Sequence, residues 1–434
     1  MEIIGASGFE NCTLLCYLAF AGCSRLKVIG IRSFANSGLR NINIPRGVTR
    51  LGADCFSGST ALEEVTFSEN ANLQTIEAGA FDGTHVLKLK IPAHVTRLPD
   101  NCFGRTLYLR KLTFERGSRL AWLGSVAFEY TSLETTHIPP RVKMVGPGYF
   151  EHCTRLQRVT FDTPSSVITL MTRSFAASSV QQICIPSSVT TLGNGSFYDC
   201  HRLALIKFEP RSRLEHIGDE AFMWGALREF TVPAGVKYIG VRSFEYCGSL
   251  AKVKWEAESE LRYIGDACFA DSGLTEFYAP ALVSSVGQAA LMDCKDLETM
   301  RFDPESNLTT IKWKTFCGSG LKQITLPAKV GVIGSESFRG CTALITLEFA
   351  PGSELQMIGE RAFAASGLTK LDLPNSVQYI KQYAFENCLA LTEVKVGEES
   401  QLIEIARNAF ENTPVKDQVR ELVAARSRNG CAVQ

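Results

Sequence analysis

The chain has 434 residues, of which 45% are hydrophobic and 26 are phenylalanine, so its composition is that of a folded protein and excludes a disordered one. Lys+Arg and Asp+Glu both number 45, which excludes a global field that would attract nucleic acid or an anionic membrane. No apolar run reaches the roughly 18 residues that a membrane-spanning helix needs. We therefore expect no transmembrane segment.

Residues 12–23 form the first apolar stretch of the chain and end in small residues and a cysteine. The preceding residues 1–11 contain two Glu and no Lys or Arg, whereas a secretory signal begins with a basic region. We interpret residues 12–23 as part of a repeat.

A repeated phenylalanine marks the organisation of the whole chain. It stands in segments such as AFDG, SFAA and AFEN, at spacings that alternate between 25 and 22 residues, so the true period is 47 residues with two rungs per period. We refer to these positions as the anchors. They are Phe9, Phe34, Phe56, Phe81, Phe103, Phe128, Phe150, Phe175, Phe197, Phe222, Phe244, Phe269, Leu291, Phe316, Phe338, Phe363, Phe385 and Phe410.

After each anchor comes a segment of the form L-x-x-V-x-I/F, with apolar side chains at every second position near its end. This alternation predicts one strand per rung, at 39–44, 86–91, 133–138, 180–185 and their counterparts. Proline recurs every 47 residues, where a residue without an N–H suits the end of a strand. These prolines are 45, 92, 139, 186, 233, 280, 327 and 374.

A single rung cannot bury its apolar side chains, but stacked rungs build one continuous core. The sequence therefore predicts an α/β fold, a right-handed leucine-rich-repeat solenoid of about eighteen rungs. We expect one parallel β-sheet on the concave face and short turns or strands on the convex face. The expected division is a solenoid over residues 1–413 and a capping helix with a tail over 414–434.

The C-terminal segment departs from the repeat. Thr413 is a candidate helix cap and Pro414 suits a first helical turn. The apolar residues that would share one face of this helix are Val415, Val419, Leu422 and Val423.

The last four residues, Cys431-Ala-Val-Gln, fit the C-a-a-X pattern with Gln at the last position, a type usually farnesylated. In a eukaryotic cell Cys431 is thus a candidate for lipidation, and coincidence in a cysteine-rich chain is the alternative.

The repeat resembles the BspA-like leucine-rich repeats, also called the Treponema pallidum class, in the 47-residue double form known from trichomonads. Segments that carry the resemblance are 153–161 (CTRLQRVTF), 183–197 (ICIPSSVTTLGNGSF) and 355–374 (LQMIGERAFAASGLTKLDLP). The resemblance covers about residues 1–413. It implies a solenoid fold and a role in protein or surface binding, and the best-known members are secreted or attached to the cell surface.

Six of the fifteen cysteines lie three residues after an anchor and 47 residues apart, namely Cys153, Cys200, Cys247, Cys294, Cys341 and Cys388. Equivalent sites two rungs apart are separated by roughly 9.6 Å, beyond the roughly 7 Å that a disulfide allows between Cα atoms. We expect free, buried thiols, which favour a reducing compartment. The predicted location is the cytoplasm, with membrane association through Cys431, and the alternative is the cell surface.

The sequence contains none of the common nucleotide-binding, hydrolase or zinc motifs, and its six His share no ligand spacing. We predict no catalysis, no cofactor and no metal site. Exposed aromatic side chains on the strands are few, so nucleic-acid bases lack a stacking surface.

The outward positions of the strands, expected on the concave face, are the candidate binding surface because solenoids commonly bind partners there. Threonine and basic residues are frequent at these positions, and Glu115, Asp162, Glu209, Glu256 and Asp303 form an expected acidic rim beside them. An alternative is that the charges only solvate the sheet. The candidate residues are Lys88, Lys90, Lys111, His137, Arg158, Lys207, Lys252, Lys254, Tyr278 and Arg301.

The predicted function is a non-catalytic scaffold that binds protein partners through this face. The alternative is a surface-exposed, BspA-like adhesin that binds host or matrix proteins.

Overall fold

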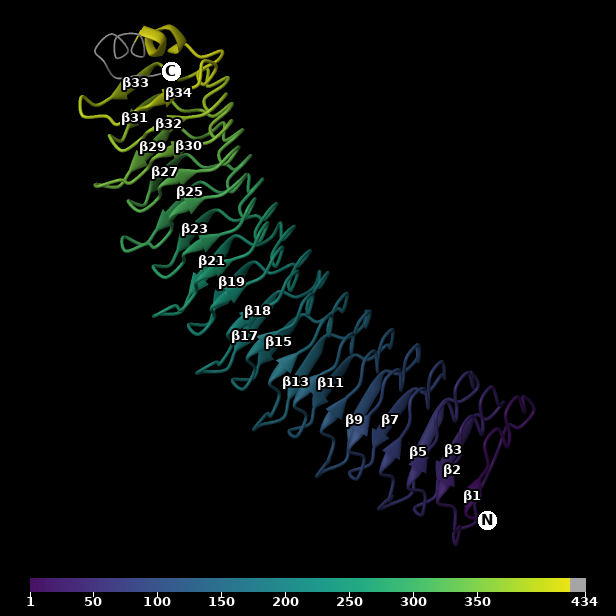
Figure 1. The fold of residues 1–434 in the computed structure, drawn as a ribbon. Coiled ribbons are helices and arrows are strands. Elements are labelled where there is room, and N and C mark those ends of the chain that lie inside the picture. Colours follow the sequence, from purple (N-terminus) through teal and green to yellow (C-terminus); the bar gives the residue numbers. More distant parts are fainter. Residues whose placement is uncertain (422–434) are drawn as a thin grey trace. The chain divides into compact units, whose positions relative to one another are not determined.

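A computed structural model describes residues 1–421 of the chain. Contacts within the chain divide it into two units, Met1–Leu214 and Glu215–Gln434. In each unit, successive rungs place their strands side by side and parallel, as Figure 1 shows. The predicted solenoid of parallel strands is confirmed, and helix is scarce in it. The predicted separation of 414–434 as a second region stays a prediction.

Each unit contains four-residue strands and two-residue strands. In the first unit the four-residue strands form one parallel sheet: β3 (Asn41–Ile44), β5 (Glu64–Phe67), β7 (Lys88–Ile91), β9 (Lys111–Phe114), β11 (Thr135–Ile138), β13 (Arg158–Phe161), β15 (Gln182–Ile185) and β17 (Leu205–Phe208). The two-residue strands are β1 (Ile3–Ile4), β2 (Val28–Ile29), β4 (Arg50–Leu51), β6 (Thr75–Ile76), β8 (Arg97–Leu98), β10 (Trp122–Leu123), β12 (Met144–Val145), β14 (Thr169–Leu170) and β16 (Thr191–Leu192).

The second unit repeats the arrangement. Its four-residue strands are β19 (Glu229–Val232), β21 (Lys252–Trp255), β23 (Glu276–Ala279), β25 (Thr299–Phe302), β27 (Gln323–Leu326), β29 (Thr346–Phe349), β31 (Lys370–Leu373) and β33 (Glu393–Val396). Its two-residue strands are β18 (His216–Ile217), β20 (Tyr238–Ile239), β22 (Tyr263–Ile264), β24 (Ser285–Val286), β26 (Thr310–Ile311), β28 (Val332–Ile333), β30 (Met357–Ile358), β32 (Tyr379–Ile380) and β34 (Glu404–Ile405).

The four-residue strands are shorter than predicted, because each begins two residues later than the sequence pattern does. Strand β3 starts at Asn41, whereas we predicted 39–44. The carbonyl oxygen of Arg40 accepts hydrogen bonds from the N–H groups of both Glu63 and Glu64, at 2.9 and 3.3 Å, so regular pairing begins only at the next residue. The predicted prolines follow directly after alternate strands, as Pro45 follows Ile44.

The anchors fill the centre of the core. Phe34 is fully buried, and its ring stacks on those of Phe9 and Phe56 at centroid distances of 5.1 and 5.5 Å. The same stacking continues in the second unit, where Phe338 lies 5.1 Å from Phe316 and 4.9 Å from Phe363. These distances follow from the rung spacing and favour offset, parallel rings.

The backbone turns tightly on both sides of each anchor. The residues two before and two after Phe34, which are Arg32 and Asn36, have φ angles of 51° and 54°. The Asn36 N–H donates to the Ser57 carbonyl of the next rung at 2.9 Å, so the left-handed conformation is held by contacts between rungs. Asn and Gly tolerate this conformation best.

The six cysteines that recur every 47 residues from Cys153 to Cys388 are buried and unpaired, as predicted, whereas Cys12, which also lies three residues after an anchor, is exposed. The Cys341 thiol donates to the Phe316 carbonyl at 3.0 Å, and its sulfur lies 3.4 Å from the Ser319 hydroxyl. The same pattern joins Cys153 to the Phe128 carbonyl. All fourteen cysteines within residues 1–421 are free.

A helix begins at residue 416 and continues to 421, the last described residue. Val415 and Val419 are buried, as predicted. The predicted cap is wrong, because the Thr413 hydroxyl donates to the Phe410 carbonyl at 2.8 Å instead of accepting from a helix N–H. Leu422, Val423 and Cys431 lie outside the described residues.

Candidate functional site

The four-residue strands expose one side chain row and bury the next, because strand side chains alternate. In β7, Lys88 and Lys90 are exposed while Leu89 is buried. We call the outward row the strand face. All ten candidate residues lie on it, and only His137 is half-buried, where it packs edge-on against Phe114 at 5.1 Å.

In the first unit the basic side chains of the strand face are mostly unpaired. Lys88 and Lys111 are partners in the register of β7 and β9, which places two like charges side by side. Within residues 1–421, no acidic oxygen lies within 4.0 Å of Lys88, Lys111, Arg158 or Lys207. Only Lys90 has such a partner, Glu115 at 3.7 Å.

In the second unit the equivalent lysines are neutralised by neighbouring strands. Lys254 forms an ion pair with Glu229 at 2.6 Å, and Lys252 forms one with Glu276. Hydrogen bonds from these lysines lower the pKa of both glutamates. Lys252 and Lys254 are thus already paired with acidic residues of this chain.

Tyr278, on β23, is the one aromatic residue that we predicted on this face. It is 39% exposed. Its hydroxyl donates to Asp303 Oδ2 at 2.5 Å, and its carbonyl accepts from the Trp255 indole at 2.8 Å. The hydrogen bond to Asp303, followed by burial, raises the pKa of Tyr278 to about 12. Asp303 of the next rung thus holds the ring through its hydroxyl, while Trp255 of the preceding rung binds the backbone of Tyr278.

Three residues of the expected acidic rim stabilise turns of the backbone. Glu115, Glu209 and Glu256 each accept a hydrogen bond from the backbone N–H that follows a repeat proline, from Ala93 at 3.0 Å, Ser187 at 2.9 Å and Ala234 at 3.1 Å. These carboxylates satisfy turn N–H groups that the strand ladder leaves unpaired.

Two shallow depressions lie over the strand face. In the first unit, a depression of about 330 Å³ lies over β13, β15 and β17 and is lined by Arg158, Cys184 and Lys207, among others. In the second unit, one of about 560 Å³ is lined by Arg301, Thr325 and Glu348, among others. In the depression of the first unit, the candidates Arg158 and Lys207 lie on either side of the exposed Cys184. Partial burial raises the pKa of the Cys184 thiol.

The described residues hold no group of three or more His, Cys, Asp or Glu arranged to bind a metal ion. A search of the same residues finds no helix with the length and apolar content that a membrane crossing requires. What the strand face offers chemically is charge and hydrogen bonding on a rigid surface.

Residues 1–110, 121–251, 215–345 and 309–420 match the family described as BspA type leucine rich repeat region, in six copies. The chain therefore belongs to the BspA-type leucine-rich-repeat family, a class of repeat scaffolds that typically mediate protein interactions.

Solved structures with the same architecture include a leucine-rich repeat protein from Bacteroides ovatus, 21% identical, which covers 88% of this chain and 87% of its own at a TM-score of 0.60. A leucine rich cell surface protein from Faecalibacterium prausnitzii is 23% identical over 88% and 87% of the two chains, with a TM-score of 0.40. The pneumococcal vaccine antigen PcpA is 16% identical over 86% and 84%, with a TM-score of 0.43. No curated protein matches the sequence.

Sequence reasoning missed two features of the surface. One is the pairing of Lys252 and Lys254 with glutamates of adjacent strands, although the phase of the repeat places these residues side by side. The other is the set of aromatic residues at the left-handed turns, such as Trp224. The signal for them in the sequence is an aromatic residue two positions after an anchor.

Proposed function

We propose that this chain is a scaffold that binds an acidic segment of a protein partner through the strand face of its first unit. The observation that carries the proposal is the set of exposed basic side chains at Lys88, Lys111, Arg158 and Lys207, none of which has an ion-pair partner among residues 1–421. Directly adjacent like charges such as Lys88 and Lys111 destabilise a sheet. Their presence favours a ligand that supplies the missing negative charge.

The proposed role needs no change in the fold. The strand backbone is fixed by the ladder, and the inward residues are buried, so the basic groups stand on a preformed surface. Preorganised charge of this kind raises the association rate and the specificity for a complementary partner.

The test uses the full chain and a fluorescent hexaglutamate peptide, with binding followed by fluorescence anisotropy. We expect the triple variant K88E/K90E/K111E to bind about tenfold or more weakly. Its melting temperature should barely change, because these side chains stand in solvent.

A matched variant, K252E/K254E/K322E, carries the same change in net charge, but its lysines are already paired with Glu276, Glu229 and Glu298. It should lose much less affinity. An equal loss in both variants would show that only net charge matters, and unchanged binding by the first variant would contradict the proposal directly.

For the cellular location we propose the cytoplasm, with membrane association through Cys431. The fourteen free cysteines within residues 1–421 support a reducing compartment. The alternative is a cell-surface adhesin. Surface biotinylation of intact cells that produce the protein separates the two, since a surface protein is labelled before lysis and a cytoplasmic one is not.

A further inference from the structure

The turns beside the anchors carry a second surface, distinct from the strand face. In the second unit, the residues two positions after four successive anchors are Trp224, Tyr246, Asp271 and Asp293, with φ angles between 55° and 62°. The N–H groups of Trp224 and Tyr246 donate to the next rung at 3.0 Å, so the rungs themselves impose this conformation. Bulky side chains rarely adopt it.

Trp224 and Tyr246 stack on each other at a centroid distance of 4.2 Å and an angle of 16°. They remain 47% and 37% exposed, so the rings do little to fill the core. Other rungs show what suits this position: Asn412 donates its amide to Asn387 at 3.1 Å and forms a polar ladder. The two rings are therefore not required by the turn.

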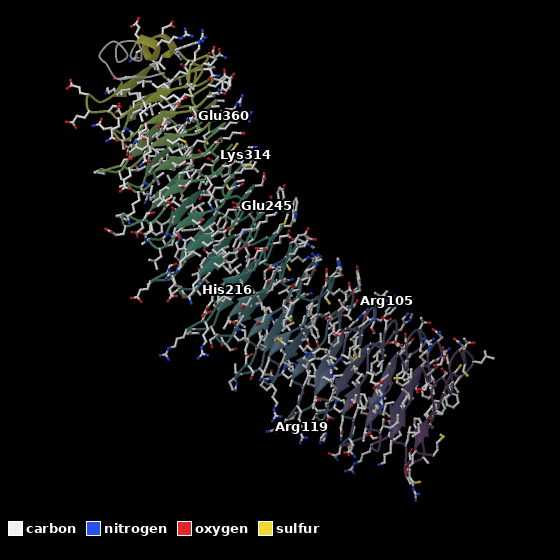
Figure 2. All side chains as sticks on the ribbon, in the orientation of Figure 1. Arg105, Arg119, His216, Glu245, Lys314 and Glu360 are labelled. Carbon is white, nitrogen blue, oxygen red and sulfur yellow. The ribbon has the colours of Figure 1, made fainter. Side chains whose placement is uncertain are left out.

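The two rungs that follow supply negative charge. Asp271 and Asp293 are half-buried, and burial together with the charge of Asp293 raises the pKa of Asp271. Within residues 1–421, no basic nitrogen lies within 4.0 Å of either carboxylate. Arg242 forms its ion pair with Glu245 and not with either aspartate. Figure 2 shows Glu245 on the same edge of the unit as Lys314 and Glu360.

The chain itself shows what fits an aromatic ring at this spacing. In three places an arginine lies over the ring of a residue one rung away: Arg361 over Tyr383 at 4.6 Å, and in the first unit Arg97 over Trp122 and Arg173 over Tyr198. Across residues 1–421, no Lys or Arg covers Trp224 or Tyr246 in this way.

We propose that Trp224, Tyr246, Asp271 and Asp293 form a binding strip for an arginine side chain of a protein partner. The planar guanidinium stacks on the exposed ring and donates hydrogen bonds to the neighbouring carboxylates. The strip selects a basic segment, whereas the strand face of the first unit selects an acidic one. It does not depend on the function proposed for that face.

The first unit contains an incomplete counterpart of this strip, 94 residues earlier in the sequence. Tyr130 and His152 stack there at 4.6 Å and an angle of 5°. The next rung carries Ala177 where the second unit has Asp271. The chain thus offers a second stacked aromatic pair, with one carboxylate fewer beside it.

The experiment measures binding of a fluorescein-labelled tetra-arginine peptide to the full chain by anisotropy. The peptide control is tetra-citrulline, which keeps the planar group without its charge. We expect W224N/Y246N to weaken tetra-arginine binding about fivefold or more. Asn fits the left-handed turn, so the melting temperature should stay equal or rise.

The variant D271N/D293N removes the charges and leaves the rings, and it should weaken tetra-arginine binding to a similar extent. Y130N/H152N makes the same aromatic change in the first unit and should weaken tetra-arginine binding less. K88E/K90E/K111E should not weaken tetra-arginine binding at all. Unchanged binding by W224N/Y246N, or equal binding of the arginine and citrulline peptides, overturns the proposal.

Discussion

Replacing Phe338 tests whether the ring stack, beyond burial alone, stabilises the array. Phe338 is fully buried between Phe316 and Phe363, with centroid distances of 5.1 and 4.9 Å and interplanar angles of 15° and 2°. Each stacked pair contributes about 0.5–1.5 kcal/mol beyond area burial. Phe338→Leu keeps most of the volume and breaks both pairs, so we expect a loss of about 1–3 kcal/mol in the free energy of unfolding.

Phe338→Ala should cost more, about 3–5 kcal/mol, because it also leaves a cavity. The chain provides a reference, since Leu291 occupies an anchor position in a natural break of the stack. The assay is urea unfolding followed by circular dichroism, with Leu291→Phe measured in parallel. A loss below about 0.5 kcal/mol for Phe338→Leu would show that stacking is irrelevant and that apolar volume alone stabilises the anchor row.

Four further predictions concern the thiols, the turns, the hydroxyl of Tyr278 and the C-terminus. In the native protein, a thiol reagent at pH 8 should modify exposed cysteines such as Cys12 and Cys16 and spare buried ones such as Cys153, because burial raises the pKa of Cys153 to about 12. Under denaturing, non-reducing conditions all fifteen cysteines should react, and recovery of several disulfides would refute this prediction. Glu209→Gln keeps one acceptor oxygen for the Ser187 N–H, while Glu209→Ala leaves the N–H without it, so only the alanine variant should lower the melting temperature, by an amount equivalent to about 1 kcal/mol. The pKa of Tyr278 is raised from 10 to about 12, so its hydrogen bond to Asp303 contributes stability below pH 10 that is lost as the pH rises to 12. In a titration followed by absorbance, Tyr278→Phe should remove a tyrosine that ionises late, at a pH near 12. Loss of a tyrosine that ionises near pH 10 would contradict the assignment. In a eukaryotic cell, Cys431→Ser should move the protein from the membrane fraction to the soluble one. We expect the unmutated protein to be only partly membrane-bound, because a single lipid chain gives weak membrane binding. Absence of a lipid mass on the C-terminal peptide would show that the motif is accidental.

The repeat made the fold predictable from sequence. Each structural position is sampled about eighteen times, so the anchors, the prolines and the buried cysteines stand out against the variable residues. The strand starts were less predictable, because the shared carbonyl of Arg40 is a detail of backbone hydrogen bonding that leaves the apolar pattern unchanged.

The charges of the candidate site were predictable in position but not in state. The register of β19 and β21 pairs Glu229 with Lys252, and the register of β5 and β7 pairs Glu64 with Lys88 in the same way. Glu229 nevertheless forms its ion pair with Lys254, two residues further along β21, at 2.6 Å, whereas Glu64 and Lys88 form none within residues 1–421. Whether two long side chains meet depends on rotamers and on further neighbours, such as Lys111 next to Lys88, and the residue pattern does not specify these.

Comparison of equivalent rungs within this one chain separates residues that build the fold from residues available for recognition. At the second strand position, Leu89, Ile183, Phe230, Ile324 and Leu371 are all apolar and buried. The neighbouring first position changes freely between cation, anion and amide along the same rungs, as Lys88, Gln182, Glu229, Gln323 and Lys370. Because the ladder fixes the backbone beneath them, these outward side chains can differ at little cost in stability. The same logic applies to Trp224 and Tyr246, where the turn is also fixed and Asn is the residue that suits it. A side chain that departs from what its position needs is therefore our reason for proposing both binding surfaces, through an unpaired lysine on a strand in one and a ring on a left-handed turn in the other.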